Sequence, residues 1–210
     1  MRPVPLVVYS DYVCPWCYMM FTSLEAAAEE VPVEVEWRAF ELRPRESLGQ
    51  IDPEAEAEKK KQIEAFWPRV EQMAKEVYGL TGIKRGRWGV DTRAAHIGAK
   101  VARRAGQESE YHRRVFAAHW VEEKDIGDPA TLSQIAAASG LDAEAFQAAL
   151  ASRHMADEVT AEAAEAHRLG IRGVPALIID SRYLLSGAQP KESLVRILSE
   201  YASTGTITNA

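Results

Sequence analysis

Cysteine is nearly absent from this sequence, which holds only Cys14 and Cys17 among its 210 residues. A framework of structural disulfides is therefore excluded, and each thiol has only the other as a partner within the chain. A tetrahedral zinc site would need two further ligands. No second CxxC motif and no closely spaced histidine pair supplies them, so the sequence predicts no metal site.

Long apolar runs and an excess of positive charge are missing as well. No apolar run approaches the roughly 20 residues that span a bilayer, so no membrane-spanning helix is predicted. The chain carries 25 Lys and Arg against 31 Asp and Glu, which disfavours a nucleic-acid partner because such a partner requires a basic surface. The first residues lack the apolar core and cleavage site of a secretory signal, so we expect a cytoplasmic protein.

Apolar periodicity near the N-terminus indicates a strand, a helix and a second strand. Residues 6–9 are a short apolar run, residues 16–31 repeat apolar positions at helical spacing, and residues 33–40 alternate. We expect the two strands to be parallel and joined by a right-handed crossover. Sheet signals return only at residues 174–179 and 183–185, ahead of a last helix.

Helical patterns occupy the middle of the chain. A charged helix is predicted from Pro53, and Pro68 is expected to break or kink it, because proline lacks the N–H that an interior helical position needs. Asp91 or Thr92 is predicted to cap another helix, and Asp128 has the residue type of a helix N-cap. Between the two sheet-forming segments the sequence is therefore helical.

The order of these elements predicts an α/β protein in which one domain interrupts another. The sheet-forming segments, residues 1–45 and 156–210, are expected to form one domain. Residues 46–155 are expected to form an all-helical domain inserted into it.

The segment Cys14-Pro15-Trp16-Cys17 directly follows the first strand and opens the first helix. Pro15 suits the first helical position, where a backbone N–H has no partner in any case. The positive end of the helix dipole then favours a thiolate at Cys14. Trp16 is uncharged, so the helix terminus must supply most of the stabilisation of this thiolate. Cys17 lies one turn further in and is expected to be more buried, with a higher pKa. Cys14 is therefore predicted to attack or be attacked, and Cys17 to resolve the mixed disulfide.

Two other interpretations of the CxxC are a half metal site and a structural staple. The first lacks further ligands. A structural staple would add little stability, because a disulfide that closes so short a loop hardly constrains the unfolded chain. A reducing compartment also disfavours a purely structural disulfide.

A second motif, Val174-Pro175, opens the late strand. In one interpretation Pro175 is a trans proline that simply starts a strand. In the other it is a cis proline facing the CxxC, and the backbone of Val174 is free to pair with an extended substrate. The residues alone leave both interpretations open.

Taken together, the motifs resemble the DsbA branch of the thioredoxin superfamily, in particular its FrnE-like members. The resemblance covers nearly the whole chain and is carried by residues 10–18, 37–42, 91–96, 125–129, 173–176 and 186–190. It implies a thioredoxin fold with an inserted helical domain. It also implies a redox pair at Cys14 and Cys17, a cis Pro175, and a substrate groove lined by Val174 and Pro175.

Two departures limit what the resemblance transfers. The periplasmic oxidants of this superfamily typically carry histidine where this chain has Trp16, so a strongly oxidising potential does not follow. Some FrnE-like proteins also have a second cysteine pair near the C-terminus. This chain has no cysteine after Cys17, which excludes a shuttle between two internal dithiols.

The sequence thus predicts a cytoplasmic thiol–disulfide oxidoreductase or isomerase that needs no metal or organic cofactor. Its expected partners are proteins or small molecules that carry thiols or disulfides, glutathione among them. One alternative is a glutathione-dependent isomerase or transferase related to 2-hydroxychromene-2-carboxylate isomerase. Another is a non-enzymatic redox sensor or chaperone-like binding module. Substrate, reduction potential, recycling partner and oligomeric state are not encoded in any motif.

Overall fold

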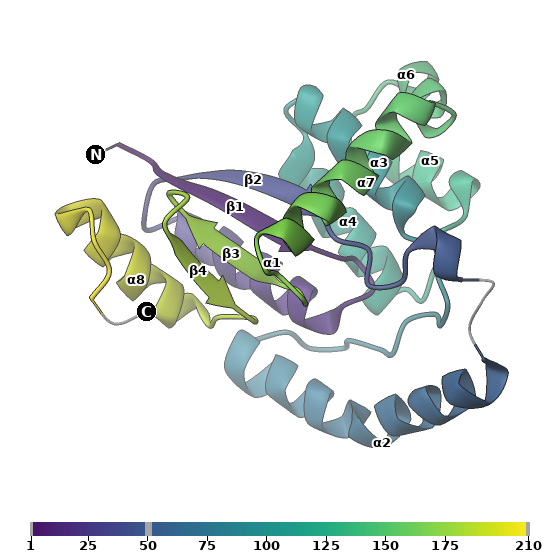
Figure 1. The fold of residues 1–210 in the computed structure, drawn as a ribbon, viewed down its shortest axis with the longest axis horizontal. Coiled ribbons are helices and arrows are strands. Elements are labelled where there is room, and N and C mark those ends of the chain that lie inside the picture. Colours follow the sequence, from purple (N-terminus) through teal and green to yellow (C-terminus); the bar gives the residue numbers. More distant parts are fainter. Residues whose placement is uncertain (1, 49–51, 209–210) are drawn as a thin grey trace. The chain divides into compact units, whose positions relative to one another are not determined.

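The computed structural model describes residues 2–48 and 52–208, which fall into two compact units (Figure 1). The first unit is built from Met1–Phe40 and Glu162–Ala210, and the second from Glu41–Ala161. Helix α7, Arg153–Arg168, runs from the second unit into the first.

The first unit contains a four-stranded mixed sheet in the order β2-β1-β3-β4. Strand β1 pairs in parallel with β2, and β3 pairs antiparallel with both β1 and β4. The expected parallel β-α-β opening is therefore confirmed, whereas the late strand begins at Ala176, two residues after the predicted start. The elements of this unit besides α7 are β1 (Val4–Ser10), α1 (Pro15–Ala28), β2 (Val33–Ala39), β3 (Ala176–Ile179), β4 (Tyr183–Ser186) and α8 (Lys191–Thr204).

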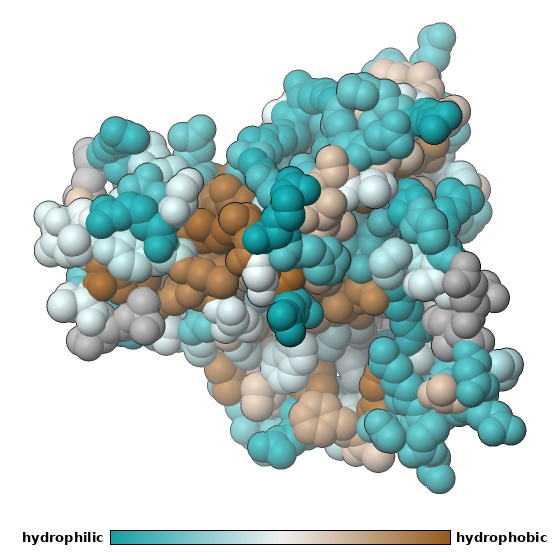
Figure 2. Space-filling view, viewed as in Figure 1, coloured by the Kyte–Doolittle hydropathy of each residue, from teal (hydrophilic) through white to brown (hydrophobic). Residues whose placement is uncertain are grey.

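Alternating side chains give the sheet two different faces. Helices α1 and α8 pack together, and α1 lies behind the sheet in the view of Figure 1. On the other face Tyr9 and Ala176 contact Ala166 of α7 in a buried apolar cluster. Away from α7 this face is less covered: Val7 is half-buried and Leu184 is 47% exposed. Figure 2 shows hydrophobic residues gathered over β1, β3 and β4 in the same view.

The second unit is helical, with α3 in contact with α4, α5 and α6. Its core is tight at Gly98 of α3, where an added Cβ would lie 2.0 Å from the hydroxyl of Tyr111 on α4. Asp128 caps α5 as predicted, because its carboxylate accepts the N–H of Thr131. The elements confined to this unit are the 3₁₀ turn Arg45–Ser47 and the helices α2 (Pro53–Tyr78), α3 (Arg93–Arg104), α4 (Glu108–Trp120), α5 (Pro129–Ala138) and α6 (Ala143–Leu150).

Of the break and the kink expected at Pro68, the break does not occur, because α2 continues through the proline to Tyr78. The buried side chains Trp67 and Val70 flank the proline, and the Trp67 ring stacks on Trp120 with centroids 5.8 Å apart. This apolar packing on both sides of Pro68 offsets the missing backbone hydrogen bond.

Among residues 2–48 and 52–208, no helix combines the length and the apolar character needed to cross a membrane.

Candidate functional site

The turn from β1 into α1 places Cys14 at the helix N-terminus. The N–H of Cys14 donates to the carbonyl of Asp11 at 3.2 Å, which closes the turn. Cys14 has extended backbone angles and is the N-cap residue, and Pro15 is the first helical residue. The Cys14 carbonyl then accepts the N–H groups of Cys17 and Tyr18. The Cys14 sulfur therefore lies at the end of α1, where the helix dipole is positive.

Cys17 occupies a different environment one turn further into α1. Both cysteines are free thiols, and Cys17 is fully buried whereas Cys14 is 5% exposed. Burial raises the pKa of Cys17 well above its ordinary value, and the hydrogen bond and charge of Cys14 raise it further. The N–H of Asp11, 3.4 Å from the Cys17 sulfur, and the hydroxyl of Ser10 oppose this shift. The two thiols are thus chemically unequal.

This raised pKa predicts a loss of stability of the reduced protein at alkaline pH. Unfolded Cys17 loses its proton above about pH 8.5, whereas folded Cys17 retains it. The contribution of Cys17 to stability is therefore complete below that pH and falls as pH rises toward the folded pKa, by up to about 1.4 kcal/mol per pH unit. Urea unfolding of the reduced protein from pH 7 to pH 10 measures the effect. In the matched Cys17→Ala variant the free energy of unfolding should depend less on pH. Equal slopes for the two proteins would contradict the raised pKa of Cys17.

The second motif lies against the CxxC although 160 residues separate them. The Val174–Pro175 peptide bond is cis, and the thiol of Cys14 donates to the carbonyl of Val174 at 3.4 Å. The N–H of Gly187 donates to the Pro175 carbonyl at 2.8 Å, which fastens this loop to the segment after β4. Of the two interpretations of Pro175, the cis proline facing the CxxC is therefore the one observed.

Other residues near the two sulfurs lie on α1 and in the turn before it. Pro15 and Trp16, between the cysteines, are partly exposed, so a reacting molecule can reach them. Asp11 is fully buried in the turn that leads to Cys14. Among the residues that the structure describes, no three His, Cys, Asp or Glu side chains come together as metal ligands would.

An ionic network that the sequence analysis missed holds α7 to the sheet of the first unit. The hydroxyl of Tyr9 donates to Glu165 at 2.9 Å, and the Arg38 guanidinium forms an ion pair with the same carboxylate. Burial raises the pKa of Tyr9 to about 12, and the hydrogen bond to Glu165 adds to the shift. On the same helix Glu162 accepts the N–H of Ala39 at 2.8 Å. These contacts secure the end of β1 that leads to Cys14.

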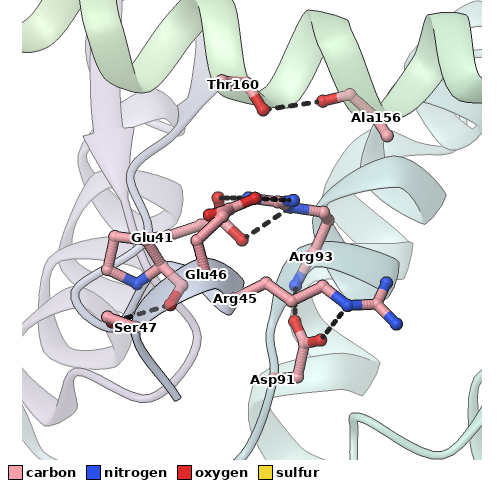
Figure 3. Close-up of polar contacts among 9 residues, drawn as sticks. Glu41, Arg45, Glu46, Ser47, Asp91, Arg93, Ala156 and Thr160 are labelled. Atoms are coloured by element: carbon pink, nitrogen blue, oxygen red, sulfur yellow. Dashed lines mark hydrogen bonds and ion pairs between the residues drawn. The ribbon is translucent and has the colours of Figure 1, made fainter. Parts of the chain in front are cut away.

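A second network in the helical unit is centred on the buried guanidinium of Arg93, at the start of α3 (Figure 3). Arg93 donates to Glu41 through Nε at 3.1 Å and Nη2 at 2.8 Å, and to Glu46 through Nη1 at 2.6 Å. The carboxylate of Asp91 accepts the N–H of Arg93 and contacts the side chain of Arg45. Thr92 is therefore the N-cap residue of α3 by position, whereas the side chain that accepts a hydrogen bond from the helix start is that of Asp91.

Comparison with known proteins identifies the family. The family model for the DSBA-like thioredoxin domain matches residues 5–199. An uncharacterised protein of Bacillus subtilis (strain 168), YwbO, is 32% identical over 199 residues, which cover 94% of this chain and 96% of YwbO. A probable DsbA oxidoreductase of Streptomyces coelicolor, SCO1869, has a similar crystal structure, with a TM-score of 0.80 and 29% identity over 99% of this chain and 93% of that one.

A second similar structure was solved with a ligand. The cytosolic disulfide reductase DsbM of Pseudomonas aeruginosa, solved with GSH, has a TM-score of 0.69 and 20% identity over 95% of this chain and 99% of that one. At this identity the likeness concerns the fold. The thioredoxin-like mixed sheet with an inserted helical region, predicted from the sequence, is confirmed. The chain belongs to the DsbA-like thioredoxin-domain family, and it is a DsbA-like thiol–disulfide oxidoreductase with the CxxC pair Cys14–Cys17.

Proposed function

We propose that this protein reduces, oxidises or rearranges disulfides through Cys14 as the attacking sulfur and Cys17 as the resolving sulfur. The observation that supports these roles is the inequality of the two thiols. Cys14 lies at the N-terminus of α1 beside the Val174 carbonyl, whereas Cys17 is fully buried and its pKa is raised. A sulfur at a helix N-terminus, where the dipole favours a thiolate, suits attack, and a fully buried neighbour one turn away suits resolution.

In the reducing direction, Cys14 first loses its thiol proton to solvent. Its thiolate attacks one sulfur of a substrate disulfide, forms a mixed disulfide, and expels the other substrate sulfur as a thiolate. The Cys17 thiol then gives up its proton, and its sulfur attacks Cys14 and expels the second substrate thiolate. The substrate gains two electrons, and the protein is left with a Cys14–Cys17 disulfide. Two thiols of an external donor return it to the dithiol.

The same pair supports the reverse reaction and isomerisation. A substrate thiolate attacks the Cys14 sulfur of the disulfide and expels the Cys17 thiolate. A second substrate thiolate then attacks the mixed disulfide, which releases an oxidised substrate and the reduced protein. Isomerisation combines attack by Cys14 with release of the mixed disulfide by a different substrate thiol, and transfers no net electrons.

The groove around Cys14 would hold the substrate. We assign Val174 and Pro175 to the wall that pairs with an extended substrate backbone, and Pro15 and Trp16 to the rim. The support is the hydrogen bond from the Cys14 sulfur to the Val174 carbonyl and the partial exposure of Pro15 and Trp16. Neither step described above calls for a metal or an organic cofactor.

The narrower assignments belong to the same proposal. A cytoplasmic location and small-thiol substrates such as glutathione are supported by the cytosolic reductase DsbM, which shares the fold and was solved with GSH. An FrnE-like subtype rests on the sequence blocks that resemble it. We also propose residues 1–45 with 156–210 as the thioredoxin-like domain and 46–155 as the inserted helical domain, on the order of strands and helices.

Equilibration with glutathione buffers tests the function directly. We expect Cys14 and Cys17 to convert as a pair, so that two thiols disappear together on alkylation trapping and Trp16 fluorescence changes at the same potential. A value of about −120 to −180 mV indicates an oxidant or isomerase, and a value of about −270 mV indicates a reductant. Thiols that stay free in oxidised glutathione, or that form only stable mixed disulfides, would contradict the proposal.

A further inference from the structure

A pocket of about 380 Å³ begins at the same loop that faces the redox sulfur. Its wall consists of residues 170–175 together with Leu184, Ser186 and Gly187. Val174 belongs both to this wall and to the redox site, because its carbonyl accepts the hydrogen bond from Cys14. The pocket and the redox site are therefore joined through the Val174 loop.

The pocket wall carries one cationic side chain, Arg172, which is exposed. Within the described part of the chain Arg172 has no ion-pair partner. Two other arginines of the same unit are engaged: Arg38 pairs with Glu36 and Glu165, and Arg182 donates to the carbonyl of Gly205. Arg172 is thus a cation two residues from Val174, the residue whose carbonyl faces the redox sulfur, and its charge has no ion-pair partner among the described residues, although the whole chain carries a net charge of −6.

The backbone of the same segment offers further donors. The N–H groups of Arg172, Gly173 and Val174 have no acceptor in the described chain, whereas those of Gly170 and Ile171 bond back to the end of α7. Successive unpaired N–H groups favour an anion, and an arginine fork binds a carboxylate in a planar, paired geometry. Leu184, 47% exposed, supplies an apolar wall opposite. The pocket therefore combines anion-binding groups with a surface for a small apolar stem.

We propose that this pocket binds a carboxylate carried next to the reacting half-cystine of the substrate, and that Arg172 is the residue that selects it. The proposal rests on the thiol–disulfide exchange proposed above and specifies its substrate class. The carboxylate has two sources, the free carboxylates of glutathione or an acidic residue beside a cystine in a polypeptide. Binding changes no covalent bond; it holds the substrate sulfur near Cys14 and so accelerates formation of the mixed disulfide.

Rates of reaction of the reduced protein with matched disulfides test this. The probes are oxidised glutathione and its fully esterified form, a pair of peptide disulfides with Glu or Gln beside the cysteine, and the neutral disulfide of 2-mercaptoethanol. We expect Arg172→Gln to lower the second-order rate constant about fivefold to tenfold for the probes that carry a carboxylate, and not to lower it for the esterified glutathione, the Gln peptide or the 2-mercaptoethanol disulfide. The matched control Arg182→Gln removes an exposed arginine of the same unit that does not line the pocket, and should change neither.

Each probe is compared between variants, so differences in leaving-group pKa among the probes cancel. A fall with oxidised glutathione alone identifies the small thiol as the source of the carboxylate, and a fall with the Glu peptide alone identifies a polypeptide. Equal rates of Arg172→Gln and the parent protein on every acidic probe would overturn the inference while leaving the proposed function intact. Failure of the parent protein to react with the neutral disulfide would instead contradict the proposed function.

Discussion

Replacing Cys17 by alanine is expected to turn the protein into a trap for its substrates. Cys14 remains at the N-terminus of α1 and still attacks, but no buried thiol is present to expel the bound substrate. Turnover in reduction of a protein disulfide such as insulin should fall by at least about 10³-fold. A mixed disulfide at Cys14 should accumulate at one equivalent, visible by intact mass and released by dithiothreitol.

The matched variant Cys14→Ser separates the two roles. It should lose turnover to the same extent and form no mixed disulfide, because Cys17 is fully buried and its raised pKa keeps it protonated at neutral pH. A glutathione-activating isomerase would not need Cys17, so full activity of Cys17→Ala would favour that alternative. A chaperone-like binding module would suppress aggregation equally well with Cys14→Ser, while insulin reduction is lost.

Removing the guanidinium of Arg93 is expected to lower the free energy of unfolding by a large amount. The Glu41 side chain is only 3% exposed, so Arg93→Leu would leave a buried carboxylate without its bidentate partner. Breaking a buried ion pair in this way destabilises by about 3–5 kcal/mol. Urea unfolding at pH 7 measures it. The stability of Arg93→Lys should lie between those of the parent protein and Arg93→Leu. Its ammonium keeps the charge but cannot reproduce the fork that reaches both Glu41 and Glu46.

Arg45→Leu is the control for this experiment. Arg45 is 68% exposed and pairs with Asp91 at 3.4 Å, so its loss should change stability by less than about 1 kcal/mol. Replacing Arg93 and Glu41 together by leucine should recover part of the loss, because no buried charge then remains unpaired. Comparable stabilities of Arg93→Leu and Arg45→Leu would contradict the role of the network.

Local signals in the sequence predicted the elements that depend on neighbouring residues. The β-α-β opening, the position of Cys14 at a helix start and the cap at Asp128 all follow from periodicity and capping within a few residues. Pro68 shows the limit of such reasoning. Its local preference for a helix break is overridden by the burial of Trp67 and Val70, which no residue near it in the sequence reveals.

By itself the sequence determined the redox pair, since two cysteines three residues apart at the start of a helix leave little choice of chemistry. Only the tertiary structure decided which side chains surround that pair. Val174 contacts Cys14 across 160 residues because β3 lies beside β1, and Arg172 lines one pocket together with Val174. Such contacts arise from the summed burial of many side chains, so no local motif encodes them.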